Sequence, residues 1–213
     1  AALGLAEALL DAGPEADHLH EWAGGCLLDE AGELLGPGDD VGGRDEHRVD
    51  AVELAVNRFL LRNPRLFNPA TTPENARIAV ETLQNLTQNL PTQTKRTEEQ
   101  DAFQQFSTPP VLAYLANWVA NVSEADTMME PSAGIGGIAT FAHNAGARLI
   151  LNELNARRAA ILQDLFRESK IWTEDAEQIN NILPDDVVPS VVVMNPPFSS
   201  SGTRGVRKDT MIG

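Results

Sequence analysis

Four short apolar segments alternate with segments of helical pattern in the second half of the chain. Residues 127–130, 148–152, 170–173 and 190–194 are predicted strands. The first two segments between them are expected to be helices that end near Ala145 and Ser169, and the third, from Asp175 to about Leu183, a helix or a turn. Strands that alternate with helices in this way favour a parallel sheet with right-handed crossovers. The sequence therefore predicts an α/β fold with a Rossmann-like parallel sheet, incomplete at about four strands.

The first hundred residues predict an acidic, mainly helical region. Apolar residues recur at helical spacing from Glu46 to Leu61, and Thr72-Pro73 opens a second helix that runs to about Leu90. We therefore expect residues 1–100 to form a helical extension and residues 101–213 to form the domain that contains the sheet.

The domain with the sheet is expected to open with a helix. Ser107-Thr108 has the composition of an N-terminal cap, and Pro109 and Pro110 suit the first turn. The apolar pattern extends this helix to about Val122.

Negative charge is concentrated at the beginning of the chain. The net charge is −15, and residues 1–50 hold 13 acidic residues but only two basic ones, Arg44 and Arg48. This balance argues against a basic footprint for nucleic acid over the whole protein. The acidic segment favours a solvated surface or a contact with a partner, and the remainder can still carry a local positive face.

Composition excludes several classes of protein. No apolar run is long enough to span a membrane, and no basic-then-apolar secretory segment is present, so we expect a cytoplasmic protein. The single Cys26 excludes an internal disulfide and a cysteine-cluster metal site. The histidines lack metal-ligand spacing, so no metal is expected; they are His18, His20, His47 and His143.

A glycine-rich turn follows the first predicted strand and precedes a helix. It begins at Glu130 and contains Gly134 and Gly136, where the backbone can turn sharply and approach a ligand. Similar turns hold a pyrophosphate in dinucleotide enzymes, but an acid at the strand end disfavours phosphate and suits a cation. S-adenosylmethionine, with its sulfonium and ammonium groups, is such a ligand. An ordinary strand-to-helix turn is the alternative.

Acidic residues also follow the second and third predicted strands. Glu153 lies about 20 residues after the glycine turn, where a carboxylate can accept both ribose hydroxyl protons. Asp175 could accept a hydrogen bond from an adenine amine, with Glu174 as its competitor. A helix-start acid and a helix cap are the structural alternatives for these two positions.

The fourth predicted strand leads directly into Asn195-Pro196-Pro197-Phe198. The Asn195 side-chain oxygen and the Pro196 carbonyl can accept the N–H groups of a planar amine that is being methylated. The prolines fix the turn, and Phe198 offers a face on which a flipped base can stack. Transfer would be direct, without a covalent enzyme intermediate. A purely structural turn is the alternative.

Residues 103–200 resemble the class I S-adenosylmethionine-dependent amino-methyltransferases, particularly the DNA adenine-N6 methyltransferases. Phe106-Ser107-Thr108-Pro109-Pro110 resembles the F-x-T-P segment of that family, and Asn195 to Phe198 resembles its catalytic NPPF motif. The motif order is similar to the gamma arrangement and to the methylase domains of phage or plasmid methylase–helicase proteins. The resemblance implies a DNA-methylating transferase of a restriction-modification or phage-defence system. It also implies cofactor contacts at Thr108, Pro109, Glu130, Pro131, Ser132, Ala133, Gly134, Gly136, Glu153, Asp175 and Asn195.

DNA is the partner that the resemblance implies, with its target adenine flipped out of the duplex. Arg204, Arg207 and Lys208 are candidate phosphate contacts, and a solvated tail is the alternative. In that family, the sheet continues with further strands, and the proteins also have a target-recognition domain. We therefore expect the methyltransferase domain to be truncated after the catalytic strand, with recognition supplied by further domains or subunits. Two other functions stay open: protein-glutamine N-methylation and a non-catalytic scaffold in a larger protein.

Overall fold

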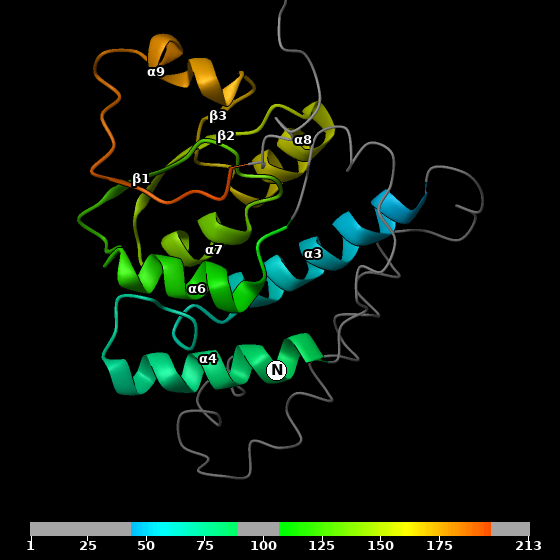
Figure 1. Cartoon of the computed structure of the whole chain (residues 1–213), viewed down its shortest axis with the longest axis vertical. Coiled ribbons are helices and arrows are strands. Elements are labelled where there is room, and N and C mark those ends of the chain that lie inside the picture. Colours follow the sequence, from blue (N-terminus) through cyan, green and yellow to red (C-terminus); the bar gives the residue numbers. More distant parts are fainter. Residues whose placement is uncertain (1–43, 89–106, 197–213) are drawn as a thin grey trace, which may run out of the picture.

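The computed structural model of the chain describes residues 44–88 and 107–196. The first range holds the helices α3 (Arg44–Arg62) and α4 (Pro73–Gln88). The second range begins with helix α6 (Pro110–Val119) and then alternates strands and helices (Figure 1). These elements are β1 (Thr127–Glu130), α7 (Gly137–Asn144), β2 (Arg148–Asn152), α8 (Ala156–Leu165), β3 (Ile171–Trp172), the 3-10 helix η2 (Ala176–Gln178), α9 (Ile179–Ile182) and β4 (Val191–Val192).

The four strands form one parallel sheet in the order β3-β2-β1-β4. Met129 in the middle of β1 pairs with Ile150 of β2 on one side and with Val192 of β4 on the other. The strand order reverses between β1 and β4. Open α/β sheets bind ligands at such a reversal, beside the carboxyl ends of the strands. The predicted α/β fold with a Rossmann-like parallel sheet of four strands is confirmed.

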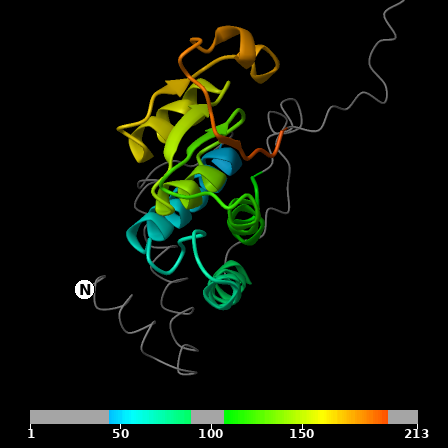
Figure 2. The same cartoon turned by 90° about the vertical axis from the view of Figure 1, so that its left-hand side faces the viewer.

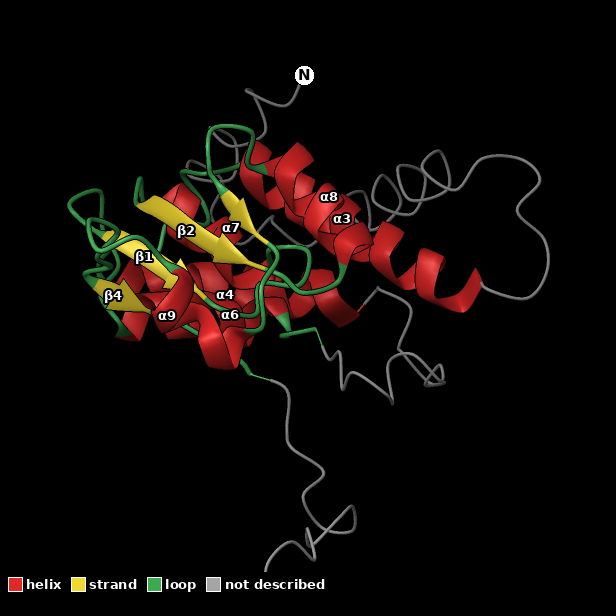
Figure 3. Cartoon of the chain, turned by 90° about the horizontal axis from the view of Figure 1, so that it is seen from above, coloured by secondary structure: helices red, strands yellow, loops and turns green. Residues whose placement is uncertain are grey.

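The two faces of the sheet are covered unequally. Met128 and Leu151 point to one face and are fully buried in the main core, with α3, α4, α6, α7 and α8. Their neighbours Met129 and Ile150 point to the other face, where Ile179 of the short α9 covers them. Successive strand residues alternate between faces, so each strand contributes to both cores. Figure 3 shows the strands side by side with helices around them.

The helices of the main face are stacked in layers. α7 lies against the sheet, α6 packs on α7, and α4 packs on α6. Helices α4 and α6 run alongside each other (Figures 1 and 2). The Tyr114 ring of α6 meets Phe141 of α7 edge-on, with centroids 5.5 Å apart. α3 packs along α7, so residues 44–88 share one hydrophobic core with the sheet. The predicted division at residue 100 stays a prediction, because residues 89–106 lie outside the described ranges.

Two predicted helix boundaries are wrong, and tertiary contacts explain both. The helix expected to be capped by Ser107-Thr108 begins at Pro110, with Pro109 at the N-cap, and ends at Val119 rather than Val122. Both hydroxyls are engaged elsewhere: that of Ser107 donates to Glu53, and that of Thr108 accepts from Asn195.

The second wrong boundary is at the end of α8. This helix ends at Leu165 rather than Ser169, because Phe166 leaves the helical conformation and buries its ring in the core. None of the helices within residues 44–88 and 107–196 is long and apolar enough to cross a membrane.

Candidate functional site

A cavity of about 400 Å³ lies beside the ends of β1 and β4. Its volume is in the range of small-molecule sites in proteins. Residues of three predicted motifs line it together: the segment before α6, the glycine turn after β1 and the turn after β4. The predicted site residues in the lining are Thr108, Pro109, Glu130, Ser132, Ala133, Gly134 and Asn195.

The glycine turn is held in place by the end of β2. The N–H of Ala133 donates to the carbonyl of Asn152 at 2.8 Å, and the Asn152 amide donates to the carbonyl of Pro131 at 2.8 Å. Gly134 and Gly136 have φ values of 57° and 88°, in the left-handed region that favours glycine. These hydrogen bonds fix the turn to the end of β2. Gly134 lines the cavity, and because glycine has no side chain a ligand can approach the backbone there.

Gly136 is also required by packing, which gives a first testable prediction. A Cβ at this position would lie 2.6 Å from Phe166 Cε2 and 2.9 Å from Leu162 Cδ1, and both side chains are buried. Gly136→Ala is expected to lower the free energy of unfolding by about 2–4 kcal/mol, from left-handed strain and overpacking. Urea unfolding of the full chain measures this.

Gly137→Ala is the matched control. A Cβ at Gly137 would lie 3.8 Å from the carbonyl of Thr108, which is ordinary contact, and Gly137 is the first residue of α7. Alanine there should be neutral or stabilising. Equal losses of stability in the two variants would contradict this account of the turn.

Glu130 is a buried carboxyl in the lining of the cavity. The residue is 2% exposed, and no described residue forms a hydrogen bond with its Oε2. Burial raises the pKa of this carboxyl well above its usual value of 4.5, and the charge of Glu153 adds to the rise. A hydrogen bond from the Ala139 N–H, at the start of α7, acts in the opposite direction. An unpartnered carboxylate oxygen is expensive to bury, so the site suits a positively charged ligand group.

Asn195 meets the segment before α6 at the cavity. Its Nδ2 donates to the Thr108 hydroxyl at 3.0 Å, across 87 residues of sequence. This bond orients the side-chain amide of Asn195. It uses Nδ2 as the donor, so Oδ1 is not engaged by Thr108 and can accept a hydrogen bond from a ligand. Pro196 follows as an exposed residue, and Pro197 and Phe198 of the same motif lie outside the described residues.

Glu153 and Asp175 do not line the cavity. Glu153 is buried, and its two carboxylate oxygens accept the N–H groups of Gly134 and Asn155, each at 2.8 Å. Burial raises its pKa, while these hydrogen bonds and Arg158 oppose the rise. Asp175 is exposed and caps η2 by accepting the N–H of Glu177 at 3.0 Å. Both acids therefore have structural partners, and their predicted contacts with ribose and adenine stay predictions.

Helix α3 forms one wall of the cavity, which the sequence did not predict. Val52, Glu53, Val56 and Asn57 all line it. The Asn57 amide donates to the carbonyl of Ile135 in the glycine turn at 2.9 Å, and both groups are buried. The helical extension is therefore part of the site.

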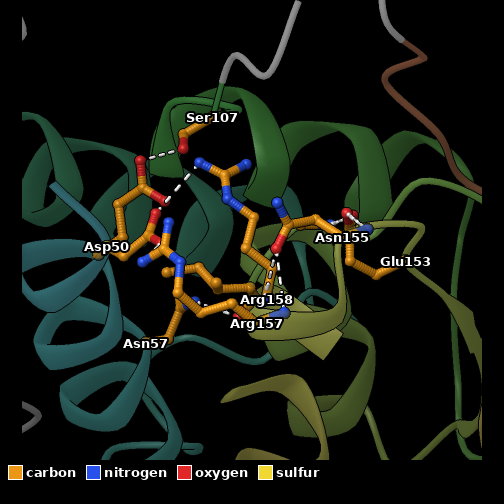
Figure 4. Close-up of polar contacts among 10 residues, drawn as sticks. Asp50, Asn57, Ser107, Glu153, Asn155, Arg157 and Arg158 are labelled. Atoms are coloured by element: carbon orange, nitrogen blue, oxygen red, sulfur yellow. Dashed lines mark hydrogen bonds and ion pairs between the residues drawn. The ribbon is translucent and has the colours of Figure 1, made fainter. Parts of the chain in front are cut away.

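A buried ion cluster beside the cavity links α3 to α8 (Figure 4). Asp50, only 2% exposed, lies 3.1 Å from Arg158 Nη2 and 2.7 Å from Arg157 Nη1. Arg158 is also buried and lines the cavity, and no described residue accepts a hydrogen bond from its Nε. A Cβ on Gly134 would lie 3.9 Å from its Nη1, so the guanidinium is beside the glycine turn.

The remaining predicted residues are not brought into the lining. Pro131 and Gly136 shape the turn without facing the cavity. The candidate phosphate contacts Arg204, Arg207 and Lys208 lie outside the described residues. Within the described ranges, no three or more His, Cys, Asp and Glu side chains gather as a metal site would require. In comparisons with known proteins, no family model, no curated protein and no solved structure matches this chain.

Proposed function

We propose that this protein transfers a methyl group from S-adenosylmethionine to the N6 amine of adenine in DNA. The observation that carries the proposal is the bond between Thr108 and Asn195, in a cavity that Glu130 and Gly134 also line. Three motifs that are distant in sequence thus meet at the carboxyl ends of parallel strands, where α/β sheets bind ligands.

The charges in the cavity fit the proposed cofactor. Among the described residues, the lining has two carboxyl groups, those of Glu53 and Glu130, and one guanidinium, that of Arg158. The unpartnered Glu130 oxygen suits the ammonium or sulfonium of S-adenosylmethionine, and the buried Arg158 suits its carboxylate. The bound cofactor supplies an electrophilic methyl group.

The amide of Asn195 would act on the nucleophile. An adenine amine is a poor nucleophile because its lone pair is delocalised into the ring. With Nδ2 engaged by Thr108, Oδ1 can accept one amine N–H, and the Pro196 carbonyl can accept the other. Preorganised acceptors of this kind stabilise the positive charge that develops on the nitrogen during transfer.

Methyl transfer from labelled S-adenosylmethionine tests the proposal. The full chain is incubated with a duplex that contains adenine and with a control duplex in which the adenines lack the exocyclic amine. Label that appears only on the first duplex, as N6-methyladenine, is the expected result. Label on cytosine or on protein glutamine would contradict the proposal. A folded protein that binds no S-adenosylmethionine, measured by calorimetry, would favour the scaffold function.

Replacing Asn195 should separate catalysis from binding. Asn195→Ala is expected to lower kcat by about 100- to 1000-fold, the scale for losing one preorganised polar group at a developing charge. The affinity for S-adenosylmethionine should change far less. Asn181→Ala, on the exposed surface of α9, is the matched control and should keep full activity. If Asn195→Ala lost affinity for S-adenosylmethionine by as large a factor as it lost kcat, Asn195 would be assigned to cofactor binding instead.

A further inference from the structure

A second and larger hollow lies at the opposite end of the strands. It has a volume of about 1020 Å³ and includes Arg148 at the start of β2 and Lys170 just before β3. The candidate cofactor cavity lies beside the other ends of the strands, after β1 and β4. In a parallel sheet these two ends are on opposite sides, so the two hollows are separate sites.

The larger hollow is basic in an otherwise acidic protein. Its lining contains five Lys or Arg side chains and two acidic ones; the five are Arg58, Arg62, Arg148, Arg167 and Lys170. Asp164, one of the two acids, is already held by Arg58 at 3.3 Å and by Arg167 at 2.7 Å. Among the described residues of the lining, positive charge therefore exceeds negative charge, although the whole chain has a net charge of −15.

Two of the cations lack acidic partners within the described structure. Arg148 is exposed and forms no ion pair with any described residue. The ammonium of Lys170, also exposed, lies 3.8 Å from the ring centroid of Trp172 and makes no ion pair there either. Exposed and unneutralised cations that share one hollow attract a polyanion.

We propose that this hollow, the basic groove, binds the phosphate backbone of a nucleic acid without reading its sequence. Four of its five cations are arginines, whose planar guanidinium matches phosphate oxygens in bidentate fashion. None of the large hydrophobic side chains that the described surface exposes lies in its lining, and its apolar members Leu61, Leu149 and Leu165 are partly buried against the core. The groove is independent of the proposed methyl transfer and lies away from the candidate catalytic turn.

Salt-dependent binding of labelled duplex DNA to the full chain, without cofactor, tests the groove. Each lost phosphate contact lowers the slope of log affinity against log salt by about 0.9. Arg148→Ala should lower the slope by about that amount, and Arg148→Ala with Lys170→Ala should lower it by about 2. Arg77→Ala, which removes an exposed arginine of α4 outside the groove, is the matched control and should leave the slope unchanged.

The outcomes separate this proposal from the proposed function. Binding of S-adenosylmethionine should be the same in wild type and in the groove variants, which also shows that the variants are folded. An unchanged salt slope in the double variant, or no DNA binding by wild type, would overturn the proposal. Displacement of the DNA by poly-glutamate at matched charge concentration would also overturn it, in favour of an acidic protein partner.

Discussion

Asp50→Ala is expected to lower the free energy of unfolding by about 3–5 kcal/mol, the scale for removing one partner of a buried ion pair. The reason is Arg158, whose side chain is 6% exposed and would lose the carboxylate that is paired with its Nη2. Arg157, with 34% of its side chain exposed, can turn to water and should contribute little to the loss. Urea unfolding of the full chain at neutral pH measures the difference.

The exposed pair of Asp164 and Arg167 provides the matched control. Asp164→Ala removes a carboxylate that lies 2.7 Å from Arg167 and 3.3 Å from Arg58, but its side chain is 48% exposed. Surface ion pairs contribute at most about 1 kcal/mol, so the free energy of unfolding of Asp164→Ala should be close to that of wild type. Replacing Asp50 and Arg158 together by apolar residues should recover most of the stability lost in Asp50→Ala. Similar losses for Asp50→Ala and Asp164→Ala would contradict the role of the buried cluster.

Glu130→Gln is expected to weaken binding of S-adenosylmethionine by about 10- to 100-fold, because a charge-assisted hydrogen bond contributes about 1.5–3 kcal/mol. A cation beside Glu130 favours the ionised carboxyl, so binding should lower its raised pKa and release a proton. The affinity of wild type should therefore rise as the pH rises through the pKa of Glu130 in the free protein. This rise should be absent in Glu130→Gln. Calorimetric titrations at several pH values measure both effects.

In the ligand-free protein, the contribution of Glu130 to the free energy of unfolding should fall as the pH rises. Because the pKa of Glu130 is raised on folding, the folded state holds its proton more tightly than the unfolded state. Its contribution to stability is complete below the usual value of 4.5 and is lost as the pH rises through the raised value. Glutamine cannot ionise, so Glu130→Gln should gain stability relative to wild type with rising pH. Glu124→Gln, an exposed residue outside the cavity, should change neither binding nor stability.

The parts of the fold that local patterns encode could be predicted from the sequence. The alternation of Met128 and Met129 between faces, and of strands with helices, needs only neighbours along the chain. The glycine turn was also predictable, because positive φ at Gly134 and Gly136 requires a residue without Cβ. The approach of Asn195 to the glycine turn followed from the parallel arrangement of the strand ends.

The contribution of α3 to the site could not be predicted in the same way. Asp50 and Arg158 are separated by 108 residues, and a pairing over that distance leaves no periodic signal. One local sign was available, because Asp50 and Asn57 are seven residues apart and share one face of a helix with the buried Leu54. Polar residues on a buried helix face need partners, and here the partners are Arg158 and the carbonyl of Ile135.

A crystal structure of the full chain with S-adenosylhomocysteine tests the central claim most directly. We expect the ligand in the cavity of about 400 Å³, with its ammonium at Glu130 and its sulfur directed toward Asn195. A ligand bound elsewhere, or an empty cavity at saturating ligand concentration, would contradict the assignment of this site.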